Sequence, residues 1–491
     1  MNAQQNTFTK VINQSNNDGL QATSAAKVLN GDFIIGANGN NNYGVLIKID
    51  NLGNIIWNKK FEAASNYIKI KDLITTADSC YILTGEIANN GNNDAILIKT
   101  DTSGNIIWSE SYSCGTSLEI NTIIETLDSD LVIIGNTNEA EPKLFISRLG
   151  KDGNILWSKQ FFQTGNKFYG KSITVTPDSN FVLIGNFTDN QSISNPFLIK
   201  MNSSGNVFWT KTITNQYVNC GYDVISESDG FISHFYINTN IAIVKYDYDG
   251  NELWSRYYYG NYAFMSNNPI QRIHKTHDHG YIIANGSDWN TFLFKIDSVG
   301  NAQWIRDLLL RGFETIETDN NELLTFGNGP LFALLKDLRY VHWNIGLIQT
   351  DSLGYSNDCN NSAYIYTDTD SLTYSSITLN SLSGGYITTH QLTVSVDSIY
   401  SDKDCVDFAG NIDNTEQTSI EVFPNPAGKE ITVKADIIKQ VEFMDSKGKI
   451  LIKKDINSDE YAFDTGNYSK GVYYIRVISD KGIRIVKVIL N

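Results

Sequence analysis

The sequence predicts an all-β protein, and three observations support this fold class. Asn, Ser, Thr and Gly are abundant among the 491 residues, whereas the helix formers Ala, Met and Arg are scarce. Short apolar runs, many of them alternating with polar residues, recur between turn-forming residues, which is typical of strands. One short segment also returns along most of the chain at a nearly constant interval.

The recurring segment is KIDNLGNIIW at residues 48–57. Five further copies keep the turn and the tryptophan, and a seventh copy, at residues 349–358, keeps only the turn. The turn glycines lie 45 to 54 residues apart and are Gly53, Gly104, Gly153, Gly205, Gly250, Gly300 and Gly354. A sustained period near 50 residues indicates a propeller, a solenoid or another repeat array.

The composition of one unit distinguishes among these architectures. The D-x-x-G segment predicts a type I turn in which glycine adopts a positive φ and joins two strands. A second hairpin signature, such as DSDLVIIG at residues 128–135, precedes it, and a further strand-like run, NTIIETL at 121–127, comes before that. Four strands in about 50 residues form one propeller blade. We expect each tryptophan to fill the space between neighbouring blades.

Residues 6–355 are therefore expected to form a β-propeller of seven blades. The seventh repeat lacks its fourth strand, and TFTKVI at residues 7–12 is the candidate that would complete it and close the ring. An additional tryptophan-bearing segment at residues 331–344 leaves eight blades open. The repeats resemble those of secreted Bacteroidota propeller proteins, and this resemblance implies an architecture but no ligand.

Residues 356–418 differ in composition and are expected to form a small β-module or a linker. No Lys or Arg occurs between residues 360 and 402, where Ser, Thr, Tyr and Asp dominate. Cys359 and Cys405 bracket this segment and are expected to form a disulfide. The other three cysteines lie in or beside strand-like runs, and none of the five has the spacing of a metal site.

Residues 419–491 contain short alternating strands separated by turns, as expected for an Ig-like β-sandwich. This segment resembles the type A C-terminal sorting domain of type IX secretion. The matching positions are Pro424, Asn425, Pro426, Gly448, Gly471, Tyr473 and Lys487. The resemblance implies that the type IX secretion machinery is a partner and that the protein is exported to the cell surface or beyond.

Other segments bear on location and on excluded partners. The residues Asn2 to Gln5 resemble the end of a signal peptide of such secreted proteins, which places the expected mature N-terminus near Gln4 or Gln5. No apolar run reaches the roughly 18 residues that a membrane-spanning helix needs, so no transmembrane segment is expected. A net charge of −16 argues against nucleic acid as a partner.

The sequence assigns no catalytic residue, cofactor or metal site. His274, His277 and His279 lie beside Asp278, but alignment with the other repeats places Asp278 to Gly280 in the turn before a strand, and His274 and His277 do not alternate on one face of a strand. No Gly-x-Ser-x-Gly motif of a serine hydrolase occurs.

One aromatic segment, RYYYGNYAFMSNNP at residues 256–269, stands where most repeats have a short polar connection. Aromatic loops on a rigid scaffold suit contact with a glycan or a protein, although packing between blades explains the same residues. The candidate ligand-binding residues are Tyr257, Tyr258, Tyr259, Tyr262 and Phe264.

The sequence thus favours a secreted or surface-displayed propeller that acts in binding or adhesion. The alternative is an extracellular propeller enzyme acting on polysaccharide. Carboxylates clustered at the centre of the ring would favour the enzyme, whereas a centre lined by Ser, Thr and aliphatic residues would favour binding.

Overall fold

The structure is a computed structural model with two compact units, Met1–Asp404 and Cys405–Asn491, which we describe separately. It describes the following residues: 7–14, 19–63, 67–89, 91–213, 219–237, 240–259, 272–286, 291–308, 310–328, 345–355, 360–362, 366–368, 374–375, 379–383, 386–388, 392–395, 399–402, 421–424, 429–444, 450–479 and 482–490. Within these ranges every regular element is a strand, and no helix is present that could cross a membrane.

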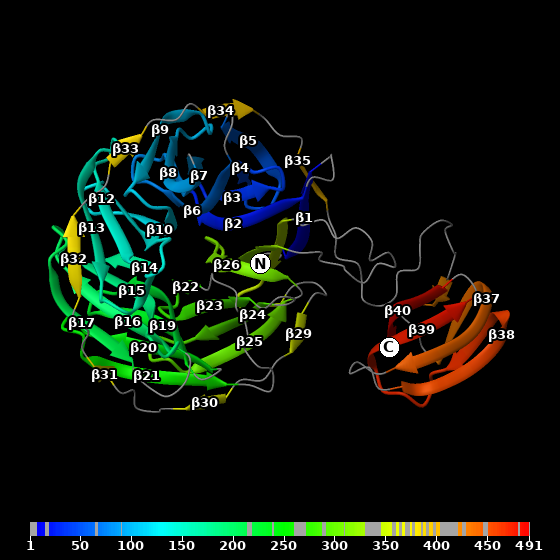
Figure 1. The fold of residues 1–491 in the computed structure, drawn as a ribbon. Helices are drawn as coiled ribbons and strands as arrows, with labels where there is room; N and C mark the ends of the chain where they lie inside the picture. The colour runs from blue at the N-terminus through cyan, green and yellow to red at the C-terminus, as the bar shows by residue number, and fades with distance from the viewer. Residues whose placement is uncertain are drawn as a thin grey trace. The chain divides into compact units, whose positions relative to one another are not determined.

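The first unit is a ring of seven antiparallel sheets, which confirms a β-propeller of seven blades (Figure 1). The strands of blades 1 to 3 are β2 (Leu20–Lys27), β3 (Phe33–Gly39), β4 (Tyr43–Ile49), β5 (Ile55–Ala63); β6 (Ile68–Thr75), β7 (Tyr81–Asn89), β8 (Asn92–Thr100), β9 (Ile106–Ser113); β10 (Leu118–Glu125), β11 (Leu131–Thr137), β12 (Leu144–Leu149) and β13 (Ile155–Phe162). In each blade the first strand is innermost and the fourth lies toward the periphery (Figure 1).

Blades 4 to 6 repeat this order. Their strands are β14 (Lys167–Val175), β15 (Phe181–Thr188), β16 (Ser194–Met201), β17 (Val207–Ile213); β18 (Asn219–Ser226), β19 (Phe231–Ile237), β20 (Asn240–Tyr246), β21 (Glu252–Tyr259); β22 (Arg272–Lys275), β23 (Tyr281–Gly286), β24 (Thr291–Ile296) and β25 (Ala302–Leu308). The second and third strands are apolar on both faces because each blade is covered by a neighbour on either side.

Blade 7 joins the two ends of the propeller. It contains β26 (Arg311–Glu317), β27 (Leu323–Asn328), β28 (Ile345–Thr350) and the N-terminal strand β1 (Phe8–Gln14). Strand β1 is antiparallel to β28, with Phe8 opposite Gln349. The prediction that the N-terminal strand closes the ring is therefore confirmed.

The tryptophan of each repeat packs against the turn glycine of the next blade. A Cβ atom added to Gly104 would lie 2.8 Å from the Trp57 indole ring, so only glycine fits there. The corresponding pairs are Trp108 and Gly153, Trp157 and Gly205, Trp209 and Gly250, Trp254 and Gly300, and Trp304 and Gly354. In blade 7 the ring of Phe8 lies against Gly53 in the same way. The N-terminal strand thus replaces both the strand and the aromatic residue that the seventh repeat lacks.

The basic residue of the repeated segment is also explained by the fold. Lys99 Nζ lies 2.7 Å from Asp78 Oδ2, and Lys295 Nζ lies 2.8 Å from Asp278 Oδ1. In both blades this ion pair joins the third strand to the turn between the first and second strands. The repeated Lys-x-Asp pattern therefore fixes the two hairpins of one blade against each other.

Residues 360–402 belong to the segment that was expected to form a small β-module or a linker. Their described strands form no sheet of their own, and each adds a fifth strand to the outer edge of one blade (Figure 1). We call this segment the belt. Its strands are β29 (Asn360–Ser362), β30 (Tyr366–Asp368), β31 (Tyr374–Ser375), β32 (Asn380–Ser383), β33 (Tyr386–Thr388), β34 (Leu392–Ser395) and β35 (Ile399–Asp402). Such short strands cannot build a core, so they use the free edges of the blades.

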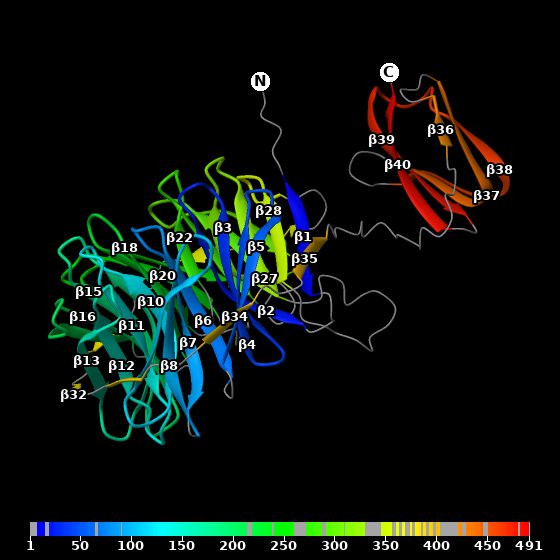
Figure 2. The ribbon, with the colours of Figure 1, turned by 90° about the horizontal axis from the view of Figure 1, so that it is seen from above.

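The second unit is a sheet structure around its own apolar core. Its strands are β36 (Glu421–Phe423), β37 (Glu430–Met444), β38 (Ile450–Asp464), β39 (Gly471–Ser479) and β40 (Gly482–Leu490). The long strand β37 pairs with β36 and β38 through its first half and with β38 and β39 through its second half. Figure 2 shows the two long strands bending together. The core includes Val433, Val441, Phe443, Ile475 and Val488.

Candidate functional site

The innermost strands surround the axis of the propeller (Figure 1). Six of them contain a β-bulge at the same position, and a bulge re-aims the side chain of its extra residue. The bulge residues are Thr23, Lys71, Asn121, Lys171, Tyr222 and Phe313. The chemistry at this position thus changes from blade to blade, although the backbone repeats.

The next residue along each innermost strand is polar in all seven blades. We call these seven residues the axial ring: Ser24, Asp72, Thr122, Ser172, Asp223, Arg272 and Glu314. Six of them are buried, and the Arg272 side chain is 22% exposed. Three of the seven residues, Asp72, Asp223 and Glu314, are buried carboxylates, and the other four are Ser, Thr or Arg.

Arg272 bridges the propeller across its axis. Its Nη2 atom lies 2.8 Å from Asp72 Oδ1, although Arg272 belongs to blade 6 and Asp72 to blade 2. Asp72 also accepts hydrogen bonds from Thr122 Oγ1 (2.6 Å) and the backbone N–H of Ile123 (3.2 Å), both in blade 3. These contacts make one buried carboxylate the meeting point of three blades.

Asp223 links the other side of the axial ring. It accepts hydrogen bonds from Ser172 Oγ of blade 4 at 2.5 Å and from the backbone N–H of Ile273 of blade 6 at 3.0 Å. Burial raises the pKa of Asp223 even though Arg272 and these donors act to lower it. This carboxylate therefore joins blades 4, 5 and 6.

His274 and Glu314 form a third contact, between blades 6 and 7. The imidazole Nε2 lies within hydrogen-bond distance of Glu314 Oε1, and Arg272 Nε lies 3.5 Å from Glu314 Oε2. Burial lowers the pKa of His274, but the charge and the hydrogen bond of Glu314 outweigh it, so the net pKa is raised. At the corresponding position most other blades have an aliphatic residue, such as Ile74 or Ile225.

A second group of side chains lies near the N-terminal ends of the innermost strands. We call it the axial patch, and its members are Tyr67, Lys71, Glu119, Tyr169, Lys171, Tyr222 and Tyr236. All are partly exposed and come from blades 2 to 5. Lys71 Nζ lies 3.1 Å from Glu86 Oε1 and 3.2 Å from Glu119 Oε1, so it is held by two carboxylates.

Lys171 has a different environment from Lys71. Burial lowers the pKa of Lys171, although the charge of Glu119 opposes this effect. Among the described residues, no hydrogen-bond or ion-pair partner lies at its ammonium group. Burial also raises the pKa of the neighbouring Tyr169, and Glu119 adds to this increase. The patch therefore contains a partly desolvated cation beside an aromatic ring.

Tyr222 covers a buried histidine. The centroids of the Tyr222 and His234 rings lie 5.6 Å apart, and those of Tyr222 and Tyr236 lie 6.5 Å apart. Within the described part of the chain, neither imidazole nitrogen of His234 has a hydrogen-bond partner, and burial lowers its pKa to about 3. His234 is therefore neutral at physiological pH and serves as an aromatic support for Tyr222.

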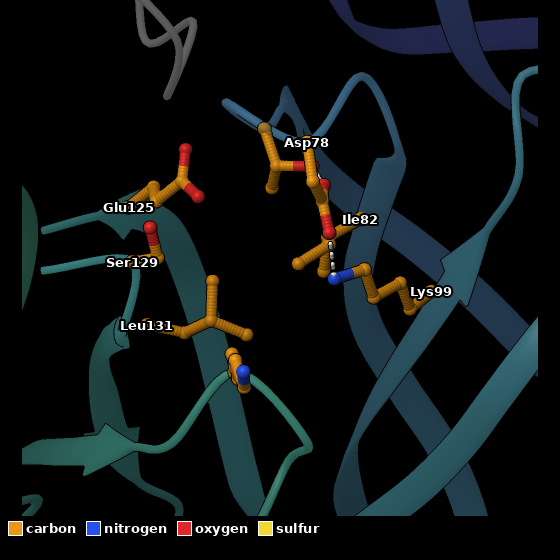
Figure 3. A pocket seen from close by; sticks show the side chains of 8 residues that line it. Asp78, Ile82, Lys99, Glu125, Ser129 and Leu131 are labelled. Atoms are coloured by element: carbon orange, nitrogen blue, oxygen red, sulfur yellow. Dashed lines mark hydrogen bonds and ion pairs between the residues drawn. The ribbon is translucent and has the colours of Figure 1, made fainter.

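A cavity of about 230 Å³ lies at the seam between blades 2 and 3, on the side of the hairpin turns (Figure 3). Figure 3 shows Lys99 directed toward Asp78, with Glu125 and Ser129 across the gap. Glu125 Oε2 accepts the backbone N–H of Ala77 at 2.8 Å. Because the Lys99–Asp78 pair recurs in other blades, we attribute this cavity to the repeat and not to a specific ligand.

Of the aromatic candidates from the sequence, the structure describes the side chains of Tyr257 and Tyr258. Tyr257 and Tyr258 are 8% and 0% exposed, and Tyr258 Oη donates to the Gly300 carbonyl at 2.6 Å. Both rings belong to the apolar core between blades. The Tyr259 side chain and residues Tyr262 and Phe264 lie outside the described part of the chain.

The other sequence-based assignments have different outcomes. Asp278 and His279 form a turn, in which His279 has a φ of 64°, so the turn interpretation of Asp278 to Gly280 is confirmed, whereas His274 lies on β22. The described residues contain no group of three or more His, Cys, Asp or Glu arranged to hold a metal ion. Cys359 and Cys405 lie outside the described residues, so their disulfide stays a prediction.

Of the sorting-signal positions, several can be located in the second unit. Gly471 begins β39, and the Tyr473 ring stacks on Phe443 with centroids 5.0 Å apart. Pro424 follows β36, and Lys487 lies on β40 opposite Tyr474. Asn425, Pro426 and Gly448 lie outside the described residues.

Comparison with known proteins identifies the second unit and supports no further assignment. Residues 421–491 match the family model of the secretion system C-terminal sorting domain. No curated protein sequence matches the chain.

Solved structures similar to the chain include a streptogramin B lyase (14% identity, TM-score 0.44, covering 70% of this chain and 98% of the lyase). They also include virginiamycin B lyase from Staphylococcus aureus (13%, 0.43, 70% and 99%) and a Bacteroides caccae protein of unknown function (12%, 0.35, 57% and 93%). At these TM-scores and identities, the similarities carry no argument about activity. The chain consists of a seven-bladed β-propeller followed in sequence by a type IX secretion C-terminal sorting domain, and its destination is the cell surface or the extracellular space.

Proposed function

We propose that this protein is a binding propeller of the cell surface and that its ligand contacts the axial patch of blades 2 to 5. The observation that carries this proposal is a series of four tyrosines and two lysines, all partly exposed, in adjacent blades 2 to 5. Lys71, Tyr169, Lys171 and Tyr222 lie on innermost strands, Tyr67 directly precedes one, and Tyr236 lies on the neighbouring strand β19. The tryptophan and glycine positions at the contacts between neighbouring blades repeat from blade to blade, whereas the positions of the axial patch do not. Residues that vary on a rigid repeating scaffold are the ones available for a specific contact.

The composition of the patch favours a glycan as the ligand. Tyrosine rings offer a flat apolar face together with a polar hydroxyl group, and they lose little conformational entropy on binding. Lys171, whose ammonium group has no hydrogen-bond or ion-pair partner among the described residues, can donate hydrogen bonds to hydroxyl or carboxylate groups of a sugar. Glu119 can accept hydrogen bonds from sugar hydroxyl groups on the same side.

The experiment is a binding screen of the purified full-length protein against immobilised neutral and uronate-containing polysaccharides. We expect binding to at least one class, and we expect the Tyr169→Ala variant to reduce the affinity at least tenfold. The matched control is Tyr355→Ala, because Tyr355 is 49% exposed but lies beside the turn glycine Gly354. Equal loss in both variants, or binding that neither variant changes, would contradict the proposal.

One observation favours the alternative of an extracellular enzyme acting on polysaccharide. His274, Glu314 and Arg272 bring a raised-pKa imidazole, a buried carboxylate and a guanidinium together near the axis. General acid–base catalysis uses groups of this kind. The same polysaccharides should therefore be assayed for cleavage. Cleavage that disappears in Glu314→Gln while the protein remains folded would establish the enzyme and overturn the binding proposal.

A further inference from the structure

The belt follows the propeller in the reverse order of its blades. Strand β29 pairs with β25 of blade 6, and the following strands pair in turn with blades 5, 4, 3, 2 and 1. The last strand, β35, reaches blade 7. Each belt strand contributes only two to four residue pairs, so the belt is held by many short contacts in series.

The end of the belt lies on the strand that closes the ring. β35 is antiparallel to β1, with Val11 opposite Asp402 and Gln14 opposite Ile399. The other edge of β1 pairs with β28, with Ile12 opposite Ile345. The N-terminal strand is thus enclosed between two segments from the distant C-terminal part of the propeller.

The attachment of β1 to blade 7, the closure of the ring and the attachment of β35 therefore depend on one another. β35 has a partner only when β1 has joined blade 7, and β1 is held on both edges only when β35 is present. The fourth strands of the blades have up to nine residues, and without the belt they would present free edges of the kind that pair with other chains. A ring without β1 would therefore lose its closure and the anchor of the belt together.

We propose that the belt is a strap that couples ring closure to the chain segment leading into the sorting domain. When the ring is closed, β35 fixes the chain at Asp402, before the second unit begins at Cys405. When the ring opens, the strap is released from this end and exposes the blade edges in sequence, beginning with blades 7 and 1. This proposal rests on strand pairing alone and is independent of the proposed ligand.

The test is native-state hydrogen exchange of the full-length protein, followed by mass spectrometry at low denaturant concentrations. Cooperative structural units exchange through one shared opening reaction. We expect peptides that contain β1, β28 and β35 to share the same opening free energy and the same denaturant dependence. If β35 opens independently at a much lower free energy, the belt lies on the ring without coupling to it and the proposal is overturned.

A pair of proline variants sharpens the result, because proline removes a backbone donor from a strand. Tyr400→Pro/Ser401→Pro disrupts β35, and we expect at least tenfold faster exchange in β28, which these residues do not touch. The matched control, Tyr366→Pro/Thr367→Pro in β30, should leave β28 unchanged because β30 pairs with blade 5. If exchange becomes faster in β35 of the Tyr400→Pro/Ser401→Pro variant while exchange in β28 stays unchanged, the coupling is contradicted. If the double variant does not fold, the comparison of opening energies in the unmodified protein still decides the question.

Discussion

The hairpin-turn side of the blades and the axial positions differ in how far their residues repeat from blade to blade. On the side of the hairpin turns, seven blades place an aromatic residue against a turn glycine, and six of them have an ion pair at equivalent positions, which Gln349 and Glu322 replace by a hydrogen bond in blade 7. At the axis, equivalent positions hold Thr, Lys, Asn, Lys and Tyr in blades 1 to 5 and Phe in blade 7. In a repeat protein, agreement between copies marks what the ring needs, and divergence marks where one blade can acquire its own contact.

The axial ring is the exception to this division, since its residues diverge and yet hold the blades together. Arg272 is the clearest case, because it contacts carboxylates of blades 2 and 7. Replacing it by Met leaves Asp72 and Glu314 buried without their cation. We expect a loss of about 3–5 kcal/mol of unfolding free energy, measured by denaturant titration.

The matched control for Arg272→Met is Lys245→Met. Lys245 pairs with Asp229, which is 61% exposed, so its removal should cost about 1 kcal/mol or less. Similar losses in the two variants would mean that the axial ring contributes no more than a surface ion pair.

The next expected effect concerns the predicted disulfide between Cys359 and Cys405. The belt strands that are nearest to these cysteines in the sequence are β29 and β35. They lie on blades 6 and 7, which are neighbours in the ring. Closing a loop of this length stabilises a protein by about 4 kcal/mol in the chain-entropy model. Mass mapping of the exported protein without reductant should show the two cysteines linked. Alkylation of both would reject the bridge.

Two glycines of blade 2 separate backbone strain from packing at the repeated end. Gly104 and Gly115 have similar positive φ values of 77° and 86°, but only Gly104 lies against a tryptophan. Gly115→Ala should cost about 1 kcal/mol through strain alone. Gly104→Ala should cost about 1–2 kcal/mol more, because the new methyl group overlaps Trp57. Equal costs, measured by chemical denaturation, would show that the tryptophan contact adds nothing.

The smallest expected effect is the pH dependence of the contact between His274 and Glu314. The charged and polar groups that face this imidazole are Glu314, Asp223 and Arg272. Because folding raises the pKa of His274, its contribution is complete below the unfolded value of about 6.5 and is lost as pH rises through the folded value. The stability difference between the unmodified protein and His274→Gln should therefore shrink on the alkaline side. A difference that grows with pH would contradict this assignment.

Much of the fold could be predicted from the sequence because the repeats carry their own alignment. The turn glycines gave the period, and the missing fourth strand of the last repeat pointed to residues 7–12. The belt could not be predicted, because strands of two to four residues have too little pattern to distinguish them from a linker.

The axial positions were missed for a different reason. Asp72, Arg272 and Glu314 have sequence numbers far apart, and only the ring brings them to one axis. Their signal was a polar residue eight or nine positions before the start of each second strand, such as Asp72 before Tyr81. Conversely, the aromatic run drew attention to Tyr257 and Tyr258, although strand residues of such composition are usually core.

The most direct test of the division between repeated and divergent positions is to give blade 4 the axial residues of blade 1. In Tyr169→Gln/Lys171→Thr, two patch residues become those that blade 1 has at Gln21 and Thr23. The account predicts a melting temperature within about two degrees of the unmodified protein and at least a tenfold weaker attachment to the polysaccharide found in the binding screen. Unchanged attachment by the stable variant would contradict the account, as would unfolding, since the patch would then serve the ring and not a ligand.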